Sequence, residues 1–226
     1  MKRLIAAIDT PDPAAARAMI HDIAPACGMI KLGLEFFMAN GPAGLAVAGD
    51  MPVFLDMKLH DIPNTVAGAV RALSRLRIAM LSIHASGGSA MIAAARDAAG
   101  EDPARPKILA VTVLTSLDEA GLAATGVRGG TAAQVENLAA LALAAGADGL
   151  VCSPHEVALL RRRFGTAPIL VVPGIRPAGA ALGDQARVMS PEQAVRAGAD
   201  YVVVGRPITQ AENPALAARL IAEAMA

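Results

Sequence analysis

Two carboxylates and a lysine stand close together in the segment DMKLHD, at the end of an apolar run typical of a buried strand. Asp56 and Lys58 are two positions apart, so their side chains leave the same face of a strand, and Asp61 follows where the chain turns toward a helix. A buried ion pair can be purely structural. Charges clustered in a pocket are nevertheless typical of functional sites, which favours a catalytic role.

A second lysine, Lys31, interrupts another apolar run. An unpaired ammonium group would be costly there, so we expect Lys31 to lie beside a carboxylate. Alternating lysines and aspartates keep each other charged, and a lysine held between anions suits a reaction that builds negative charge on carbon and then protonates it. An anionic substrate group at about 4 Å from Asp56 would be repelled by about 4 kcal/mol, and its loss as neutral CO2 would relieve that repulsion.

A second group of polar residues lies near the end of the chain. VVPGIRP contains Arg176, Gln185 lies in the loop that follows, and VVVGRP contains Gly205 and Arg206. The planar guanidinium group of arginine can donate two parallel hydrogen bonds to phosphate oxygens, and glycine lets the backbone approach a ligand closely. These residues predict a phosphate site, although a surface salt bridge is the alternative for either arginine alone.

Two further polar residues follow predicted strands. Asp9 comes after the first strand and Thr115 after the fifth, so both could face the same cavity. Asp9 could instead cap the helix that begins near TPDP. His60 and His84 also lie near this region, but neither is expected to be catalytic.

The elements that must position these residues alternate between short β-branched runs and Ala-rich segments of helical period. Eight strands are predicted, at LIAAID from Leu4, GMIKLG from Gly28, VFLDMKL from Val53, AMLSIHA from Ala79, KILAVTVL from Lys107, GLVCS from Gly149, ILVVPG from Ile169 and YVVVGR from Tyr201. Helices are predicted over residues 13–24, 34–48, 64–77, 132–145 and 191–197, with loop-rich stretches at 115–130 and 174–191.

Eight such βα units in 226 residues predict a TIM (β/α)8 barrel of the α/β class, forming a single domain over residues 1–226. A doubly wound sheet would show similar local periodicity. In a barrel, both loop-rich stretches would lie at the carboxyl ends of the strands, where active-site loops belong.

Composition narrows the possible partners. Twenty basic and twenty acidic residues give a net charge of +0, so nothing predicts a nucleic-acid or membrane-surface partner. Cys27 and Cys152 lack metal-binding or disulfide spacing and are expected to be buried. The first apolar run is too short for a leader or a membrane span, which favours a cytoplasmic protein.

DMKLHDIPNT, at residues 56–65, resembles the DxKxxDIPNT signature of orotidine 5'-monophosphate decarboxylases of the bacterial type. The resemblance continues in family order through AIDT at Ala7, KLGLEFF at Lys31, IHASGG at Ile83, VTVLTS at Val111, VVPGIRP at Val171, DQARV at Asp184 and VVVGRPIT at Val202. It covers nearly the whole chain and departs from the pattern at no functional position, although residues 117–130 align least clearly.

The resemblance implies a homodimeric barrel that converts orotidine 5'-monophosphate to uridine 5'-monophosphate and CO2, the last step of de novo UMP synthesis, without metal or cofactor. By its place in the motif, Lys58 would protonate C6 of the pyrimidine. Asp56 would lie beside the departing carboxylate, and Lys31 would link that carboxylate to the ribose. Asp9 would bind a ribose hydroxyl group.

The remaining positions implied by the resemblance fall into two groups. Asp61, Ile62 and Thr65 would reach into the partner subunit's site, so that each active site is shared. The others would contact the base or the phosphate: Thr115, Pro173, Arg176, Gln185, Gly205 and Arg206.

Two other functions remain open. A metal-dependent decarboxylase or aldolase of related fold would use Asp56 as a Mg²⁺ ligand, but such relatives have a glutamate where this chain has Lys31, and a lysine would repel the metal. A non-catalytic barrel that binds a phosphorylated nucleotide would keep the phosphate site and misplace the proton donor.

Overall fold

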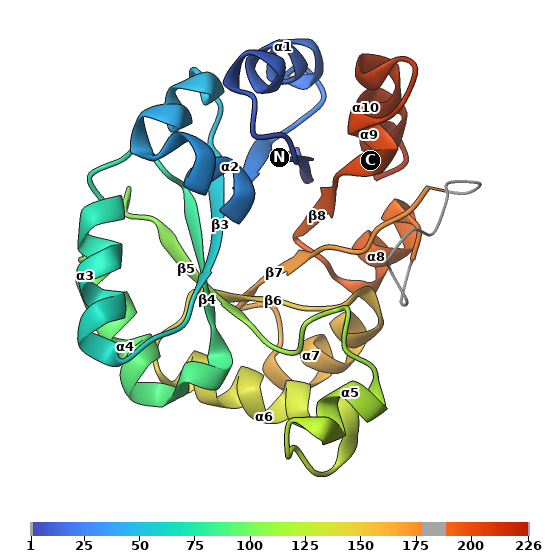
Figure 1. The fold of residues 1–226 in the computed structure, drawn as a ribbon. Coiled ribbons are helices and arrows are strands. Elements are labelled where there is room, and N and C mark those ends of the chain that lie inside the picture. Colours follow the sequence, from blue (N-terminus) through green and yellow to red (C-terminus); the bar gives the residue numbers. More distant parts are fainter. Residues whose placement is uncertain (1, 178–188, 226) are drawn as a thin grey trace.

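The computed structural model describes residues 2–177 and 189–225, and within them eight parallel strands close into a barrel in chain order (Figure 1). The strands are β1 (Leu4–Ile8), β2 (Met29–Gly33), β3 (Val53–Leu59), β4 (Met80–His84), β5 (Lys107–Val111), β6 (Gly149–Val151), β7 (Ile169–Val172) and β8 (Tyr201–Val204). Pairing of β1 with β8 closes the ring, which confirms the predicted (β/α)8 barrel over a doubly wound sheet.

Helices surround the barrel (Figure 1). They are α1 (Pro13–Ile23), α2 (Leu34–Asn40), α3 (Pro63–Leu73), α4 (Gly88–Ala99), α5 (Glu119–Ala124), α6 (Gly130–Ala144), α7 (Val157–Phe164), α8 (Pro191–Ala197), α9 (Arg206–Thr209) and α10 (Pro214–Glu223), with short 3-10 turns η1 (Pro42–Ala48), η2 (Ala85–Gly87) and η3 (Pro154–Glu156). None of the helices described is long and apolar enough to cross a membrane.

Several predicted elements differ from the structure, and the helix predicted over 64–77 ends at Leu73. The single helix expected over 34–48 is broken at Gly41, which adopts a φ of 61°, and η1 follows from Pro42. The loop expected over 115–130 contains α5, which the side chain of Asp118 caps by accepting the amide of Gly121. The strand expected from Lys107 to Leu114 ends at Val111.

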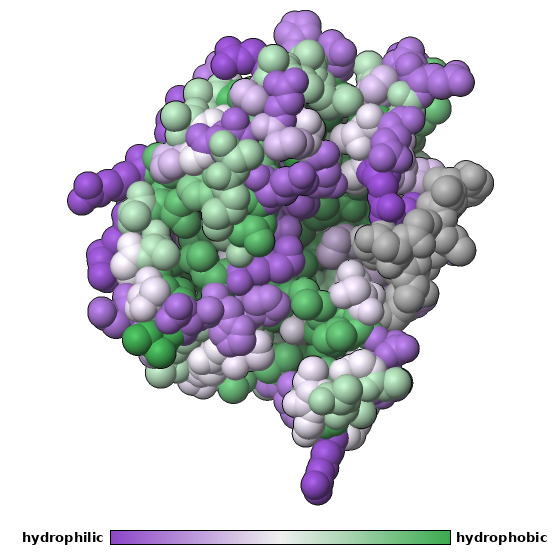
Figure 2. All heavy atoms as spheres, in the orientation of Figure 1, coloured by the Kyte–Doolittle hydropathy of each residue, from purple (hydrophilic) through white to green (hydrophobic). Residues whose placement is uncertain are grey.

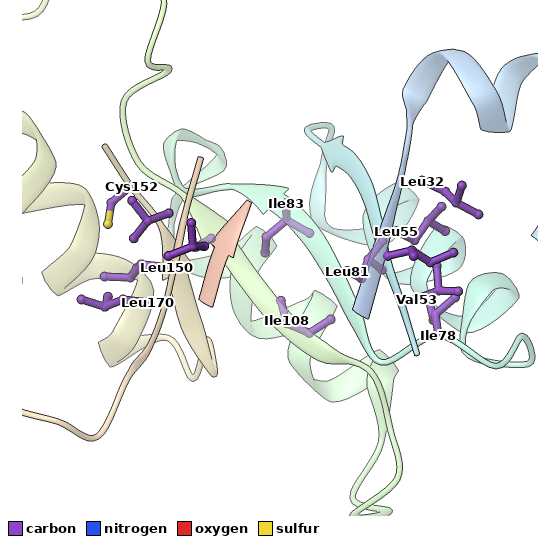
Figure 3. Close-up of a cluster of buried hydrophobic side chains, with 14 of the residues drawn as sticks. Leu32, Val53, Leu55, Ile78, Leu81, Ile83, Ile108, Leu150, Cys152 and Leu170 are labelled. Carbon is purple, nitrogen blue, oxygen red and sulfur yellow. The ribbon is translucent and has the colours of Figure 1, made fainter. Parts of the chain in front are cut away.

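Side chains alternate along the strands between two buried layers. Leu55, Leu81 and their counterparts belong to an outer layer that packs against the helices, part of which Figure 3 shows. Phe54, Met80 and their counterparts fill the interior of the barrel. This period of two decides which polar residues can point into the barrel. The expected burial of Cys27 and Cys152 is confirmed, and both lie in the outer layer.

The carboxyl end of β3 is irregular. Leu55 pairs with Leu81 of β4, but the next pairing joins Leu59 to Ile83. Between these two pairings β3 contains two more residues than β4. Lys58 lies in this irregularity with a φ of 48°, a left-handed conformation that no other non-glycine residue adopts in the described part of the chain.

The opposite, amino-terminal ends of the strands carry structural ion pairs. The carboxylate of Asp148 accepts hydrogen bonds from two guanidinium nitrogens of Arg105, each at 2.7 Å, and from the backbone amide of Ile108 at 2.8 Å. Burial raises the pKa of Asp148, but the hydrogen bonds from Arg105 and Ile108, together with the charges of Arg105 and Lys107, outweigh burial and hold the pKa below its ordinary value. Asp200 repeats the arrangement with Arg161 and a backbone amide of β7. These charges tie neighbouring strands together away from the predicted site.

Candidate active site

Four charged side chains form an alternating array at the carboxyl ends of β1, β2 and β3. Lys58 Nζ donates to Asp56 Oδ2 at 2.8 Å, and Lys31 Nζ lies 3.4 Å from the same oxygen. Lys31 Nζ also lies 3.8 Å from Asp9 Oδ1. The order Asp9, Lys31, Asp56, Lys58 therefore places each lysine next to at least one carboxylate, as the sequence predicts.

Asp56 is the most buried member of the array, with 9% of its surface exposed. Burial raises the pKa of this carboxyl group, but the charges of Lys31 and Lys58 and the hydrogen bonds from Lys58 and Ser82 lower it by more. The pKa of Asp56 thus lies below its ordinary value, and the carboxylate is ionised at neutral pH. An anionic substrate group placed beside it would meet a like charge with little solvent to screen it.

Ser82 is a residue of this site that the sequence analysis did not single out. It is fully buried in β4, and its hydroxyl donates to Asp56 Oδ1 at 2.7 Å. A usable signal was present in the sequence, because Ser82 follows Met80 by two positions and Met80 faces the barrel interior. A polar residue at that inward position should lie level with Asp56.

The array opens into a cavity of about 330 Å³ at the carboxyl ends of the strands. Arg176 and Arg206 also line this cavity. Burial and the nearby Arg206 both lower the pKa of Arg176, as expected where two guanidinium groups lie close together. Two neighbouring cations suit a doubly charged anion such as a phosphate group.

Gly205 lines the cavity next to Asp9. A Cβ atom at this position would come within 3.1 Å of Asp9 Oδ2 and 3.5 Å of the Ala7 side chain. Glycine therefore leaves room beside Asp9 for a ligand that reaches from Arg206 to the array.

Most of the predicted site residues converge on this cavity. Its lining includes Asp9, Lys31, Asp56, Lys58, Thr115, Pro173, Arg176, Gly205 and Arg206. The alternative that Asp9 caps the first helix is wrong, because Asp12 is the residue whose carboxylate accepts the amide of Ala14 there. Gln185 lies outside the described residues.

Three predicted site residues do not reach the cavity of their own chain. Asp61 and Ile62 are exposed on the segment between β3 and α3, Thr65 is exposed in the first turn of α3, and none of the three lines the cavity. The carboxylate of Asp61 accepts the amide of Ile62 at 2.6 Å. A single chain therefore leaves these side chains directed to solvent.

The histidines near the array take no part in lining the cavity. The rings of His60 and His84 lie 5.4 Å apart, centroid to centroid. Partial burial, then the neighbouring His60 and Lys58, lower the pKa of His84, so the half-buried ring is neutral at pH 7. His60 is exposed, and the expectation that neither histidine is catalytic stays a prediction.

A larger cavity of about 760 Å³ lies at the opposite end of the barrel, where Val53 begins β3 and Ala79 precedes β4. No member of the charged array lines it. In the described part of the chain, no three His, Cys, Asp or Glu side chains gather as a metal site would require.

A closed parallel barrel with a charged array and two arginines on one cavity defines a (β/α)8-barrel enzyme that acts on an anionic metabolite. The chain belongs to the orotidine 5'-phosphate decarboxylase / HUMPS family, whose model matches residues 2–221.

Individual relatives agree with this assignment. The chain is 55% identical over 223 residues to the orotidine 5'-phosphate decarboxylase of Anaeromyxobacter sp. (strain K), covering 98% of this chain and 97% of the relative. It is 54% identical to that of Gluconobacter oxydans, covering 99% and 97%. The crystal structure of orotidine 5'-phosphate decarboxylase from Lactobacillus acidophilus superposes with a TM-score of 0.86 at 35% identity, covering 100% of this chain and 99% of that one.

Proposed function

We propose that the chain decarboxylates orotidine 5'-monophosphate to uridine 5'-monophosphate and CO2 in pyrimidine biosynthesis, without metal or organic cofactor, with Lys58 as the proton donor to C6. Family membership and relatives that share more than half of its residues support the decarboxylase activity. The observation that carries the mechanism is that the Lys31, Asp56 and Lys58 array lines the same cavity as Arg176 and Arg206.

The proposed chemical step needs only groups of this chain. The bond between C6 and the carboxylate breaks, CO2 leaves, and the electron pair stays on C6. Lys58 then transfers a proton from its ammonium group to C6 and is reprotonated from solvent. The ionised Asp56 destabilises the neighbouring substrate carboxylate, and its hydrogen bond from Lys58, 2.8 Å long, holds the proton donor beside the reacting carbon.

The rest of the substrate would extend across the cavity to the arginines. Lys31 and Asp9 would bind the ribose hydroxyl groups, and Thr115 and Pro173 would lie near the base. The phosphate would be held by Arg176, Gln185, Gly205 and Arg206. Because the phosphate is far from the bond that breaks, its binding energy can act only by positioning the reacting end of the substrate.

A metal-dependent reaction is the nearest alternative, and the array argues against it. A cation beside Asp56 would meet the ammonium groups of Lys31, 3.4 Å from Asp56, and Lys58, 2.8 Å from it. We expect the purified protein to decarboxylate orotidine 5'-monophosphate at its full rate in excess chelator, measured by the change in ultraviolet absorbance. Loss of turnover that Mg²⁺ restores would support the metal-dependent alternative, and absence of turnover in either condition would support a non-catalytic binding protein.

We also propose a homodimer with shared active sites. Ile62 is 67% exposed, and Leu34 and Met38 of α2 are 51% and 70% exposed. Leu34 and Met38 are four residues apart and so share one face of α2, and contiguous exposed apolar side chains of this kind are typical of an interface. The face of the molecule that Figure 2 shows mixes hydrophilic and hydrophobic side chains. Burial of Ile62 against a second copy would carry Asp61 and Thr65 toward the partner's array. The cytoplasmic location stays a prediction.

Mixed dimers test the shared site directly. We expect Lys58→Ala and Asp61→Ala proteins each to be nearly inactive, but their mixture after subunit exchange to recover about one quarter of wild-type activity. Half of randomly formed dimers are mixed, and each mixed dimer holds one intact site. Decarboxylation is measured before and after exchange. A mixture no more active than its components would contradict the shared site.

A further inference from the structure

We infer that Ser82 is a positioning residue for the proposed decarboxylation, because its single hydroxyl group holds both the carboxylate of Asp56 and the backbone of Lys58. This inference rests on the proposed function. Ser82 does not line the cavity, so it would act through the two residues that do.

Two hydrogen bonds define the direction of the Ser82 hydroxyl. Its oxygen lies 2.7 Å from Asp56 Oδ1, and the backbone amide of Lys58 lies 2.9 Å from the same oxygen. A backbone amide can only donate a hydrogen bond. The Ser82 hydroxyl therefore accepts a hydrogen bond from the Lys58 amide and donates its own to the Asp56 carboxylate. Both interactions lie where Ser82 has no exposed surface.

The irregular register of β3 explains why a side chain is needed here. Between the Leu55–Leu81 and Leu59–Ile83 pairings, Ser82 alone faces three residues of β3. A regular ladder would pair the Lys58 amide with a backbone carbonyl of β4, but the left-handed Lys58 departs from that ladder. The Ser82 hydroxyl supplies the missing acceptor and so supports the conformation that aims Lys58 into the cavity.

The same hydroxyl selects which oxygen of Asp56 faces the lysines. Oδ1 is tied to Ser82, which leaves Oδ2 to contact Lys58 and Lys31. Without the hydroxyl, the carboxylate could rotate, and the Lys58 amide would lack a partner in a partly buried position. The proton donor would then occupy several positions, of which only some are productive.

Four variants test this role. Ser82→Ala removes the hydroxyl, Ser82→Thr keeps it, and Ser82→Val matches threonine in shape without it. Thr112→Val is the matched control, because Thr112 is also buried but its hydroxyl lies 3.3 Å from the Val151 carbonyl, outside the cavity.

We expect Ser82→Ala to lower kcat about 10- to 100-fold and to change KM by less than about threefold, because the hydroxyl acts on the donor and not on substrate contacts. Ser82→Thr should exceed Ser82→Val in kcat by a similar factor, whatever the cost of the added methyl group. Thr112→Val should keep wild-type kcat.

A measurement without turnover separates this inference from the proposed function. The ¹³C resonance of the Asp56 carboxyl group is titrated in the free protein, with Lys31, Lys58 and His84 unchanged around it. We expect the pKa of Asp56 to rise in Ser82→Ala and to stay unchanged in Thr112→Val. Inactive wild-type protein would refute the proposed function alone. A Ser82→Ala protein with wild-type kcat and an unshifted Asp56 titration would overturn the positioning role.

Discussion

Replacement of Lys58 by alanine is expected to lower kcat about 10⁴-fold, the upper range for loss of a general acid, because no other lysine in the described chain contacts Asp56 as closely. The variant should still bind uridine 5'-monophosphate, since Arg176 and Arg206 are untouched. The measurement is the rate of decarboxylation at saturating substrate, with product binding measured by calorimetry.

Lys107→Ala is the control for Lys58→Ala, because Lys107 begins β5 at the opposite end of the barrel. It should retain wild-type turnover. Unimpaired decarboxylation by Lys58→Ala would refute the proposed proton donor, whereas loss of both turnover and product binding would point to a misfolded site.

The second large effect is expected from Arg206→Ala, which should lower kcat/KM for orotidine 5'-monophosphate about 10²- to 10³-fold. Charge-assisted hydrogen bonds to phosphate are worth about 1.5–3 kcal/mol each, and an arginine fork can make two. Both KM and kcat should worsen, because phosphate binding is proposed to hold the reacting end of the substrate in place. Steady-state kinetics measure both.

The phosphate-free nucleoside orotidine is the sharpest control for Arg206. Its slow decarboxylation should be the same in wild type and Arg206→Ala, since the lost contact has no counterpart in that substrate. Arg219→Ala, an exposed arginine of α10 near Glu223, should affect neither substrate. Unchanged kinetics for orotidine 5'-monophosphate in Arg206→Ala would show that the phosphate binds elsewhere.

Much of the barrel could be predicted because period-two alternation is a local property of sequence. The alternation that separates Phe54 from Leu55 assigns each strand residue to the interior or to the helices. The same rule, applied to β4, would have identified Ser82. Gly41 and Pro42 likewise carried the signal that ends α2, but the long Ala-rich pattern around them favoured one continuous helix.

Other features could not be predicted because they depend on partners distant in the sequence. The left-handed conformation of Lys58 follows from the pairing of β3 with β4, and nothing in DMKLHD indicates it. The distance between Lys31 and Asp56 depends on the register of β2 against β3. The proposed role of Asp61 and Thr65 lies in the active site of a second subunit. Only the resemblance to a known family could therefore suggest that role from the sequence.

The backbone of Lys58 has a consequence for evolution. A non-glycine residue in the left-handed region costs roughly 1–2 kcal/mol, so glycine at position 58 would relieve that backbone cost while removing the proposed proton donor and its 2.8 Å contact with Asp56. The backbone conformation and the activity therefore favour opposite residues at this one position. A lineage that no longer needed the reaction would be expected to lose this lysine early, while the rest of the barrel persisted as a scaffold for other ligands.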